Sequence, residues 1–212
     1  MFFPQNKTIL VHIPKTGGTS IENEIANKFL NIKDNQSKFL HENHTIRGFF
    51  KKIELGTPMG HRHSFISEYG DFLELNDYDS FVILREPFSQ VLSMYRQIKD
   101  NHRSKKILNL APSLQDFIFG NCKNDLKFFD YYLNQYKFTH INGELKVNHV
   151  FLYEKYHEVQ DFVEKKYNIK IDKNKRLMKT TEDSQILTQD MKNEIKKCYP
   201  ETFDLYDEYL KK

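Results

Sequence analysis

Short apolar runs alternate along this chain with longer stretches in which apolar residues recur every three or four positions. Residues 8–13, 81–84 and 147–153 form the clearest runs, and their β-branched and aromatic side chains predict buried strands. A stretch with helical spacing follows each run. Because strands that alternate with helices favour a parallel sheet covered on both faces, we expect an α/β fold with a central, mostly parallel sheet flanked by helices.

The helices are predicted from the spacing of their apolar positions. Ile21, Ile25 and Phe29 recur at i, i+4 and i+8 after the first run, and Pro87 suits the first turn of a helix after the second. The segment 61–66 is expected to be a short extended piece. Further helices are expected over residues 88–98, 114–119, 127–133, 156–163, 184–197 and 200–210.

Composition narrows the class of protein. The 212 residues suit a single domain over residues 1–212, with room for a small helical addition, and the 39% of hydrophobic residues can form a core. The net charge of +3, from 32 basic and 29 acidic residues, gives no nucleic-acid-binding footprint. No apolar run approaches the roughly 18 residues of a membrane span. Cys122 and Cys198 form no CxxC motif, so we expect a cytoplasmic protein.

Residues 12–20, with the sequence HIPKTGGTS, form a glycine-rich loop between the first strand and the first helix. Two adjacent glycines let the backbone curl around an anion, and the first N–H groups of the helix have no helical partner. Lys15 adds a compact positive charge. The candidate anion donors are the backbone N–H groups of Gly17, Gly18, Thr19 and Ser20 and the hydroxyl groups of Thr16, Thr19 and Ser20.

This loop differs from a Walker A loop, in which the lysine follows the glycines. No later aspartate is obviously placed to hold magnesium, which disfavours a kinase or an ATPase. A sulfuryl group carries less charge than a terminal phosphoryl group, so its transfer depends less on a metal. An ordinary Gly-Gly turn with a solvated lysine is the alternative interpretation of the loop.

A second anion site is predicted at the end of the second strand. Arg85 offers a planar fork of donors that suits phosphate, and Ser89 and Ser93 follow at i+4 and i+8, on one helix face. An arginine that caps the sheet and two ordinary helix serines are the alternative. Ligands of parallel sheets bind at the carboxyl ends of the strands, so the two sites together fit a nucleotide with two separated anionic groups.

His61 and His63 are the candidates for a catalytic base, because histidine titrates near neutral pH. In an extended segment their side chains share one face. Two surface histidines, or a partial metal site without an evident third ligand, are the alternatives. His12, at the end of the first run, is expected to be a core histidine with a hydrogen-bond partner.

The segment at 12–20 closely resembles the 5′-phosphosulfate loop of the sulfotransferases that use 3′-phosphoadenosine 5′-phosphosulfate (PAPS). The nearest branch includes heparan sulfate 2-O-sulfotransferase and many bacterial relatives. The resemblance implies a P-loop-type three-layer fold, transfer of a sulfuryl group from PAPS to an acceptor hydroxyl, and no metal cofactor. Because this branch acts on carbohydrate, the hydroxyl of a glycan is the expected acceptor.

The resemblance also assigns roles to single residues. It implies that the loop binds the 5′-phosphosulfate and that Lys15 stabilises charge on the leaving oxygen. In this family an Arg-Asp/Glu-Pro segment and a serine eight residues after the arginine hold the 3′-phosphate, and here they are Arg85 and Ser93. The second histidine of a His-x-His pair is the base in the similar branch. That residue is His63, and His61 would contact the substrate.

Two other interpretations stay open. A P-loop kinase or nucleotide hydrolase would depend on magnesium, and a non-catalytic nucleotide-binding module would keep the fold without the reaction. The basic loops at 102–106 and 173–179 could contact an acidic glycan or the nucleotide, although solvated loop charge explains them as well. The identity of the acceptor and the oligomeric state do not follow from the sequence.

Overall fold

The computed structural model describes residues 2–3, 7–30, 63–71, 73–100, 109, 111–122, 132–171 and 185–212. These residues belong to two compact units. The first unit comprises Met1–Leu84 and Lys137–Leu177, and the second comprises Arg85–Tyr136 and Met178–Lys212. The expectation of a single domain over residues 1–212 stays a prediction.

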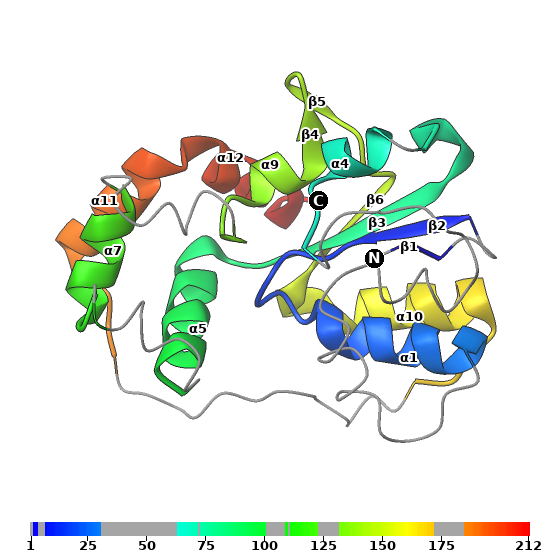
Figure 1. The fold of residues 1–212 in the computed structure, drawn as a ribbon, viewed down its shortest axis with the longest axis horizontal. Helices are drawn as coiled ribbons and strands as arrows, with labels where there is room; N and C mark the ends of the chain where they lie inside the picture. Colours follow the sequence, from blue (N-terminus) through cyan, green and yellow to red (C-terminus); the bar gives the residue numbers. More distant parts are fainter. Residues whose placement is uncertain are drawn as a thin grey trace. The chain divides into compact units, whose positions relative to one another are not determined.

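A four-stranded sheet forms the centre of the first unit (Figure 1). Its strands are β1 (Phe2–Phe3), β2 (Thr8–Val11), β3 (Asp79–Leu84) and β6 (His149–Leu152), in the order β1-β2-β3-β6. β2, β3 and β6 run parallel, while β1 pairs antiparallel with β2 at one edge. The expected, mostly parallel sheet is therefore confirmed, and its three parallel strands end along the same edge.

Helices and one hairpin flank this sheet. α1 (Gly18–Leu30) and α10 (Tyr156–Tyr167) pack against each other, and α10 also packs on β6. Figure 1 shows both helices on one face of the sheet and α4 (Ile66–Gly70) on the other, beside the hairpin of β4 (His140–Ile141) and β5 (Glu144–Leu145). The arrangement confirms the expected α/β fold with helices around a central sheet.

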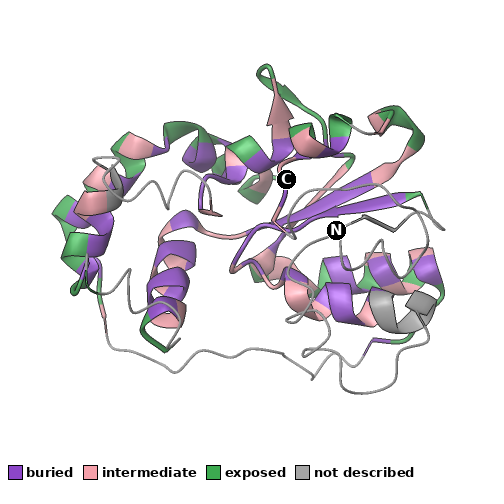
Figure 2. Cartoon of the chain, viewed as in Figure 1, coloured by how far each residue is buried: buried purple, intermediate pink, exposed green. Residues whose placement is uncertain are grey.

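The apolar pattern of the sequence becomes the core of the first unit. Residues 8–11 and 80–84 are buried because the sheet is covered on both faces (Figure 2). The helices contribute apolar residues at i, i+4 spacing, as amphipathic helices do. Those that are almost fully buried are Ile21, Ile25, Val159 and Val163.

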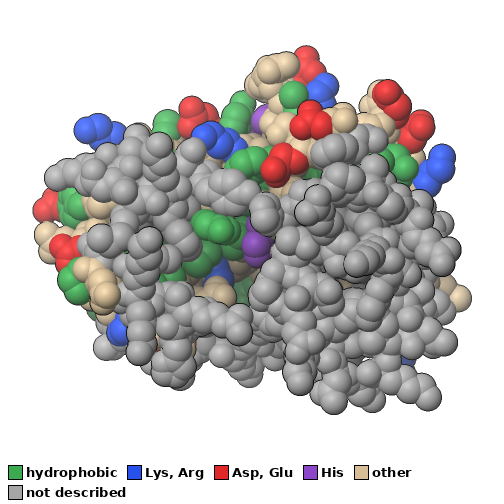
Figure 3. Space-filling view, in the orientation of Figure 1, with side chains coloured by type: hydrophobic (Ala, Val, Ile, Leu, Met, Phe, Trp, Pro, Cys, Tyr) green, Lys and Arg blue, Asp and Glu red, His purple; other side chains and the backbone are tan. Residues whose placement is uncertain are grey.

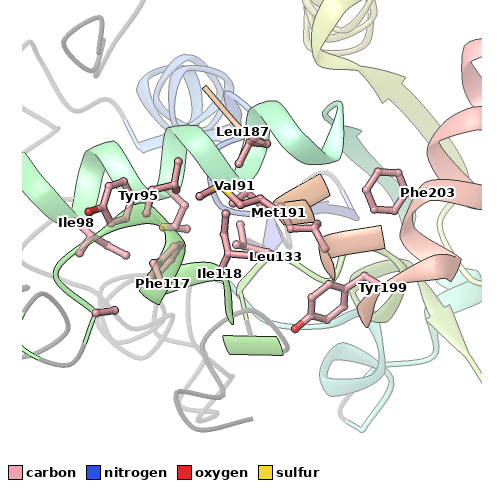
Figure 4. Close-up of a cluster of buried hydrophobic side chains, with 14 residues drawn as sticks. Val91, Tyr95, Ile98, Phe117, Ile118, Leu133, Leu187, Met191, Tyr199 and Phe203 are labelled. Carbon is pink, nitrogen blue, oxygen red and sulfur yellow. The ribbon is translucent and has the colours of Figure 1, made fainter. Parts of the chain in front are cut away.

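The second unit is mainly helical. Its long helices are α5 (Pro87–Asp100), α7 (Leu114–Cys122), α11 (Gln189–Cys198) and α12 (Pro200–Leu210). α7 packs against α11, and α12 packs against both α5 and α11. Figure 4 shows the buried cluster that their apolar faces form, with Tyr95, Phe117, Ile118, Met191 and Phe203 among its members. Pro87 begins α5, as expected from its preference for the first turn.

Two element boundaries differ from the prediction. The extended segment expected over 61–66 is wrong at its end, because Ile66 begins α4 and is buried there. The helix expected over 184–197 begins only at Gln189. Thr188 caps it by accepting a hydrogen bond from a backbone N–H at 3.3 Å, and residues 185–187, which the structure describes before this cap, are not helical.

The hairpin of β4 and β5 was not predicted. Its turn residues, Asn142 and Gly143, have φ values of 51° and 83°, a combination that suits a tight two-residue turn between antiparallel strands. Two short helical turns lie near the hairpin in the sequence. α9 (Gln135–Thr139) precedes the hairpin, and η4 (Tyr153–Lys155) follows β6. His61, the basic loops at 102–106 and 173–179, and residues 127–131 of an expected helix lie outside the described residues.

The described surface carries both signs of charge. Acidic and basic side chains are interspersed over the described part of the visible face (Figure 3). No helix in the described ranges is long and apolar enough to cross a lipid bilayer.

Candidate functional site

The loop between β2 and α1 is the centre of the candidate site. It leaves the buried end of β2 and enters the first turn of α1 at Gly18. Lys15 and Gly17 both have left-handed backbone conformations, with φ values of 68° and 86°. A lysine in this conformation costs about 1–2 kcal/mol, because its Cβ crowds the following carbonyl. The loop therefore holds Lys15 in a conformation that the chain would not adopt without support.

The first turn of α1 is suited to an anion. The first N–H groups of a helix lack carbonyl partners four residues back, and they form the positive end of the helix dipole. No acidic residue lies in the first turn of α1. Ser20 N–H donates to the Gly17 carbonyl at 3.2 Å, and the Thr16 hydroxyl donates to the Ile13 carbonyl at 2.8 Å. Because the hydroxyl proton of Thr16 is donated within the loop, Thr16 would bind a ligand through its backbone N–H.

Two tyrosines that come late in the sequence pack against this loop. The Tyr156 hydroxyl donates to the Gly17 carbonyl at 2.8 Å, across 139 positions of sequence. A Cβ added at Gly17 would lie 2.7 Å from Cε2 of Tyr156 and 3.2 Å from the ring of Tyr153. Glycine is therefore required at position 17 both for its positive φ and for the space beside these rings.

His12 lies at the start of the loop and is buried, with 3% of its surface exposed. Its Nδ1 lies 2.5 Å from Oε1 of Glu22, whose side chain has no exposed surface. A Cβ added at Gly18 would lie 2.7 Å from Cδ2 of the His12 ring. The expectation of a core histidine with a hydrogen-bond partner is confirmed, and the ring also forms the seat for the first residue of α1.

The structure brings His63 to the same place. Its Nδ1 lies 3.0 Å from the carbonyl oxygen of His12, and the two rings meet edge-on with centroids 4.7 Å apart. Because a carbonyl oxygen can only accept a hydrogen bond, Nδ1 of His63 carries the proton and donates it. This tautomer leaves a lone pair on Nε2, which is the form that a general base needs.

The segment after His63 is fixed by α4. Phe65 N–H donates to Oε2 of Glu68 at 2.7 Å, which closes the first turn of that helix. Tyr69 is buried on the same helix, and burial together with repulsion from the nearby carboxyl groups of Glu22 and Glu68 raises the pKa of its hydroxyl well above the ordinary value. Tyr69 therefore stays protonated, and the negative charge of Glu22 contributes to this shift of its pKa.

Arg85 follows β3 directly and is the first residue of the second unit. Its N–H donates to Oε1 of Gln135 at 3.0 Å, and Nε2 of Gln135 donates back to its carbonyl at 2.7 Å. Glu86 accepts hydrogen bonds from Phe88 N–H at 3.1 Å and from Ser89 N–H at 2.6 Å. The carboxylate of Glu86 thus occupies the N-terminus of α5. A phosphate at this site would have to be held by side chains rather than by the helix end.

The predicted site residues fall into two groups. The first unit brings residues 15–20 and His63 together around His12. Arg85 and Ser93 belong to the second unit, where Arg85 lies between β3 and α5 and Ser93 is buried within α5. The expectation that they share one helix face is wrong, because α5 begins only at Pro87. His61 lies outside the described residues. Within the part of the chain that the structure describes, no three His, Cys, Asp or Glu side chains form a possible metal site.

A sequence model of one protein family covers nearly the whole chain. A sequence model described as the sulfotransferase family matches residues 1–206. The chain belongs to the sulfotransferase family. The match includes residues of both units, and no curated protein and no solved structure matches the chain. The protein is therefore an enzyme of sulfuryl transfer, with the P-loop-like fold that was expected for a sulfotransferase.

This sulfotransferase site contains residues that the sequence did not single out. Glu22 lies three positions before Ile25, on the apolar side of α1, and an acidic residue on such a face was the one local signal available. Tyr153 and Tyr156 carried no signal for their role, because their contact with Gly17 arises only when α10 packs beside α1.

Proposed function

We propose that this sulfotransferase takes its sulfuryl group from PAPS and uses His63 as the base that activates an acceptor hydroxyl. The observation that carries the proposal is the contact of 3.0 Å between His63 Nδ1 and the His12 carbonyl. It puts the imidazole beside the loop that is suited to the donor, in the tautomer that can accept a proton on Nε2. A carbohydrate hydroxyl is the acceptor that we propose, with His61 as its contact, on the basis of the resemblance.

The 5′-phosphosulfate of the donor would be bound at the start of α1. The helix dipole and the absence of acidic residues in the first turn of α1 both favour an anion there. Lys15 would contact the bridging oxygen that leaves with the nucleotide. The donor-binding residues that we propose for this end are Lys15, Thr16, Gly17, Gly18, Thr19 and Ser20.

The 3′-phosphate would be bound by Arg85 and Ser93. A guanidinium group can hold a phosphate with two parallel hydrogen bonds, which a lysine cannot do. Glu86 already occupies the first N–H groups of α5, so binding through side chains is the mode that fits this end of the helix. Two anion-binding groups of this kind favour PAPS over ATP, whose phosphates form a single chain.

The reaction would be an in-line displacement at sulfur. The acceptor oxygen forms the new S–O bond while its proton passes to Nε2 of His63, and the S–O bond to the 5′-phosphate breaks. Lys15 and the N–H groups of the loop stabilise the charge that develops on the leaving oxygen. The products are the sulfated acceptor and adenosine 3′,5′-bisphosphate. This scheme assigns no step to a metal ion, because the transferred group carries less charge than a phosphoryl group.

We propose the partners and the compartment of the protein from its sequence. The small net charge favours an acceptor other than nucleic acid, and the cysteine usage favours the cytoplasm. A glycan acceptor would be recognised outside the donor loop, where the resemblance offers no guide.

The proposal is tested by nucleotide binding and by transfer. Adenosine 3′,5′-bisphosphate should bind in the presence of EDTA. Lys15→Ala should weaken this binding by about 10-fold or more, as expected for the loss of a charged hydrogen bond. Lys170→Ala, an exposed lysine, is the matched control. Binding of ATP that requires magnesium, with none of the bisphosphate, would instead indicate a kinase or nucleotide hydrolase.

Catalysis is tested separately with radiolabelled PAPS and a panel of 4-nitrophenyl glycosides as acceptors. His63→Ala should keep its affinity for the bisphosphate and lower the transfer rate by about 100-fold or more. The exposed His157 offers the control variant His157→Ala. Transfer by His63→Ala at the rate of the unsubstituted protein would remove His63 from the mechanism.

A further inference from the structure

Beneath the donor loop lies a buried pair of titratable groups that the proposed mechanism does not use. Glu22 has no exposed side-chain surface, His12 is 3% exposed, and their nearest atoms are 2.5 Å apart. A buried carboxylate is costly unless it is paired and hydrogen-bonded. The pair holds the His12 side chain in one position, so the contacts of His12 decide what the pair can influence.

His12 contacts both halves of the reaction site. Its carbonyl oxygen accepts the hydrogen bond from His63 Nδ1 at 3.0 Å, and its ring meets the His63 ring at an interplanar angle of 78°. The same ring lies against Gly18, where an added Cβ would come within 2.7 Å of Cδ2 and 2.9 Å of Nε2. A rotation of the His12 side chain would therefore disturb the first residue of α1 and the imidazole of His63 together.

Glu22 fixes that rotation from the opposite side. Its carboxyl group holds Nδ1 of His12, which leaves the ring one orientation. After burial, the charge of Glu22 also contributes to the raised pKa of the Tyr69 hydroxyl on α4.

We propose that Glu22 and His12 are positioning residues that hold His63 in the Nδ1–H tautomer and aim its Nε2 at the acceptor. The inference rests on the proposed role of His63 as the base. In this arrangement Glu22 orients the His12 ring, and the edge of that ring keeps the His63 ring where its Nδ1 can donate to the backbone carbonyl of His12. Replacing a group that orients a functional side chain in this way typically changes activity by about 10-fold to 100-fold.

Glu22→Gln is the direct test, because glutamine keeps the size of the side chain and removes its charge. Glu24→Gln makes the same change two positions away on the same helix and is the matched control. We expect Glu22→Gln to lower kcat for sulfuryl transfer to a 4-nitrophenyl glycoside by about 10-fold to 100-fold. The KM for PAPS and the affinity for adenosine 3′,5′-bisphosphate should change less than kcat does, because Lys15 and the other donors of the loop are kept even where the His12 ring shifts against Gly18.

Nitrogen-15 NMR of the histidine rings provides the readout that a merely structural role would not change. His63 should show a protonated Nδ1 and an unprotonated Nε2 in the unsubstituted protein and in Glu24→Gln. In Glu22→Gln it should show a mixture of both tautomers. An unchanged kcat in Glu22→Gln, or an unchanged His63 tautomer, would overturn the positioning role.

A second variant decides the matter if Glu22→Gln does not fold. In His12→Asn the side-chain amide can replace Nδ1 as the partner of Glu22, and the carbonyl oxygen is kept, while the ring edge beside His63 is lost. A lowered kcat with bisphosphate binding retained supports the inference, and a wild-type kcat overturns it. Failure of the proposed function is distinguishable, because then the unsubstituted protein itself would not bind the bisphosphate or transfer sulfate.

Discussion

Replacing Gly17 with alanine tests how the donor loop is built. The first part of the cost is conformational, because alanine at a φ of 86° costs about 1–2 kcal/mol. The second part is steric, because the new Cβ would lie 2.7 Å from Cε2 of Tyr156, and crowding of this kind costs about 1–3 kcal/mol. Together they should lower the free energy of unfolding by about 2–5 kcal/mol. The crowding should also push the loop away from Tyr156.

Gly143 provides a matched control within the same unit. Its φ is 83°, yet nothing lies within 4 Å of a Cβ added there, so Gly143→Ala should show only the conformational part of the cost. Urea unfolding of both variants and of the unsubstituted protein measures the difference. Calorimetry with adenosine 3′,5′-bisphosphate should show binding at least about 10-fold weaker in Gly17→Ala alone, as for the loss of well-placed charged hydrogen bonds. Equal destabilisation in the two variants, or unaltered binding in Gly17→Ala, would refute the role given to the tyrosine contact.

Three further predictions concern separate parts of the protein. Arg85→Ala should weaken the binding of adenosine 3′,5′-bisphosphate by about 10-fold or more and leave the binding of adenosine 5′-monophosphate unaffected, since only the first ligand has a 3′-phosphate. Equal losses of affinity for the two ligands in calorimetry would contradict the assignment. Burial raises the pKa of Tyr167 to about 12 from its ordinary value of 10.0, so the unfolded chain ionises first as the pH rises. The free energy of unfolding should then fall by up to about 3 kcal/mol between roughly pH 10 and 12, and urea titrations of Tyr167→Phe should lack this part of the fall. Thr188→Ala should cost about 0.5–2 kcal/mol in thermal or urea unfolding because α11 loses its cap, and an unchanged midpoint would argue against that cap.

The sheet and the long helices could be predicted because burial dictates their sequence pattern. Strands covered on both faces read as continuous apolar runs, and this is how the runs at 8–13 and 81–84 were recognised. The apolar face of α5 was read in the same way from its helical spacing. The hairpin around Asn142 was missed although its Asn-Gly pair was visible, because the flanking strands have two residues each and no clear alternation.

The candidate site was also predictable only where its residues are neighbours in the sequence. The donor loop is contiguous in the sequence, so its glycines and Lys15 could be recognised locally. The bond from His63 to the His12 carbonyl spans 51 positions, and that from Tyr156 to Gly17 spans 139, so both depend on how α4 and α10 pack. Glu22 was missed because a single acidic residue in an amphipathic helix is ordinarily solvated, and only the fold shows that it is buried against His12.

A crystal structure of the protein with adenosine 3′,5′-bisphosphate would examine the whole assignment at once. We predict that the 5′-phosphate lies on the backbone N–H groups of residues 16–20 beside Lys15, that the 3′-phosphate meets Arg85 and Ser93, and that Nε2 of His63 faces the 5′ end. A nucleotide bound elsewhere, or one whose 3′-phosphate does not reach Arg85, would contradict the account.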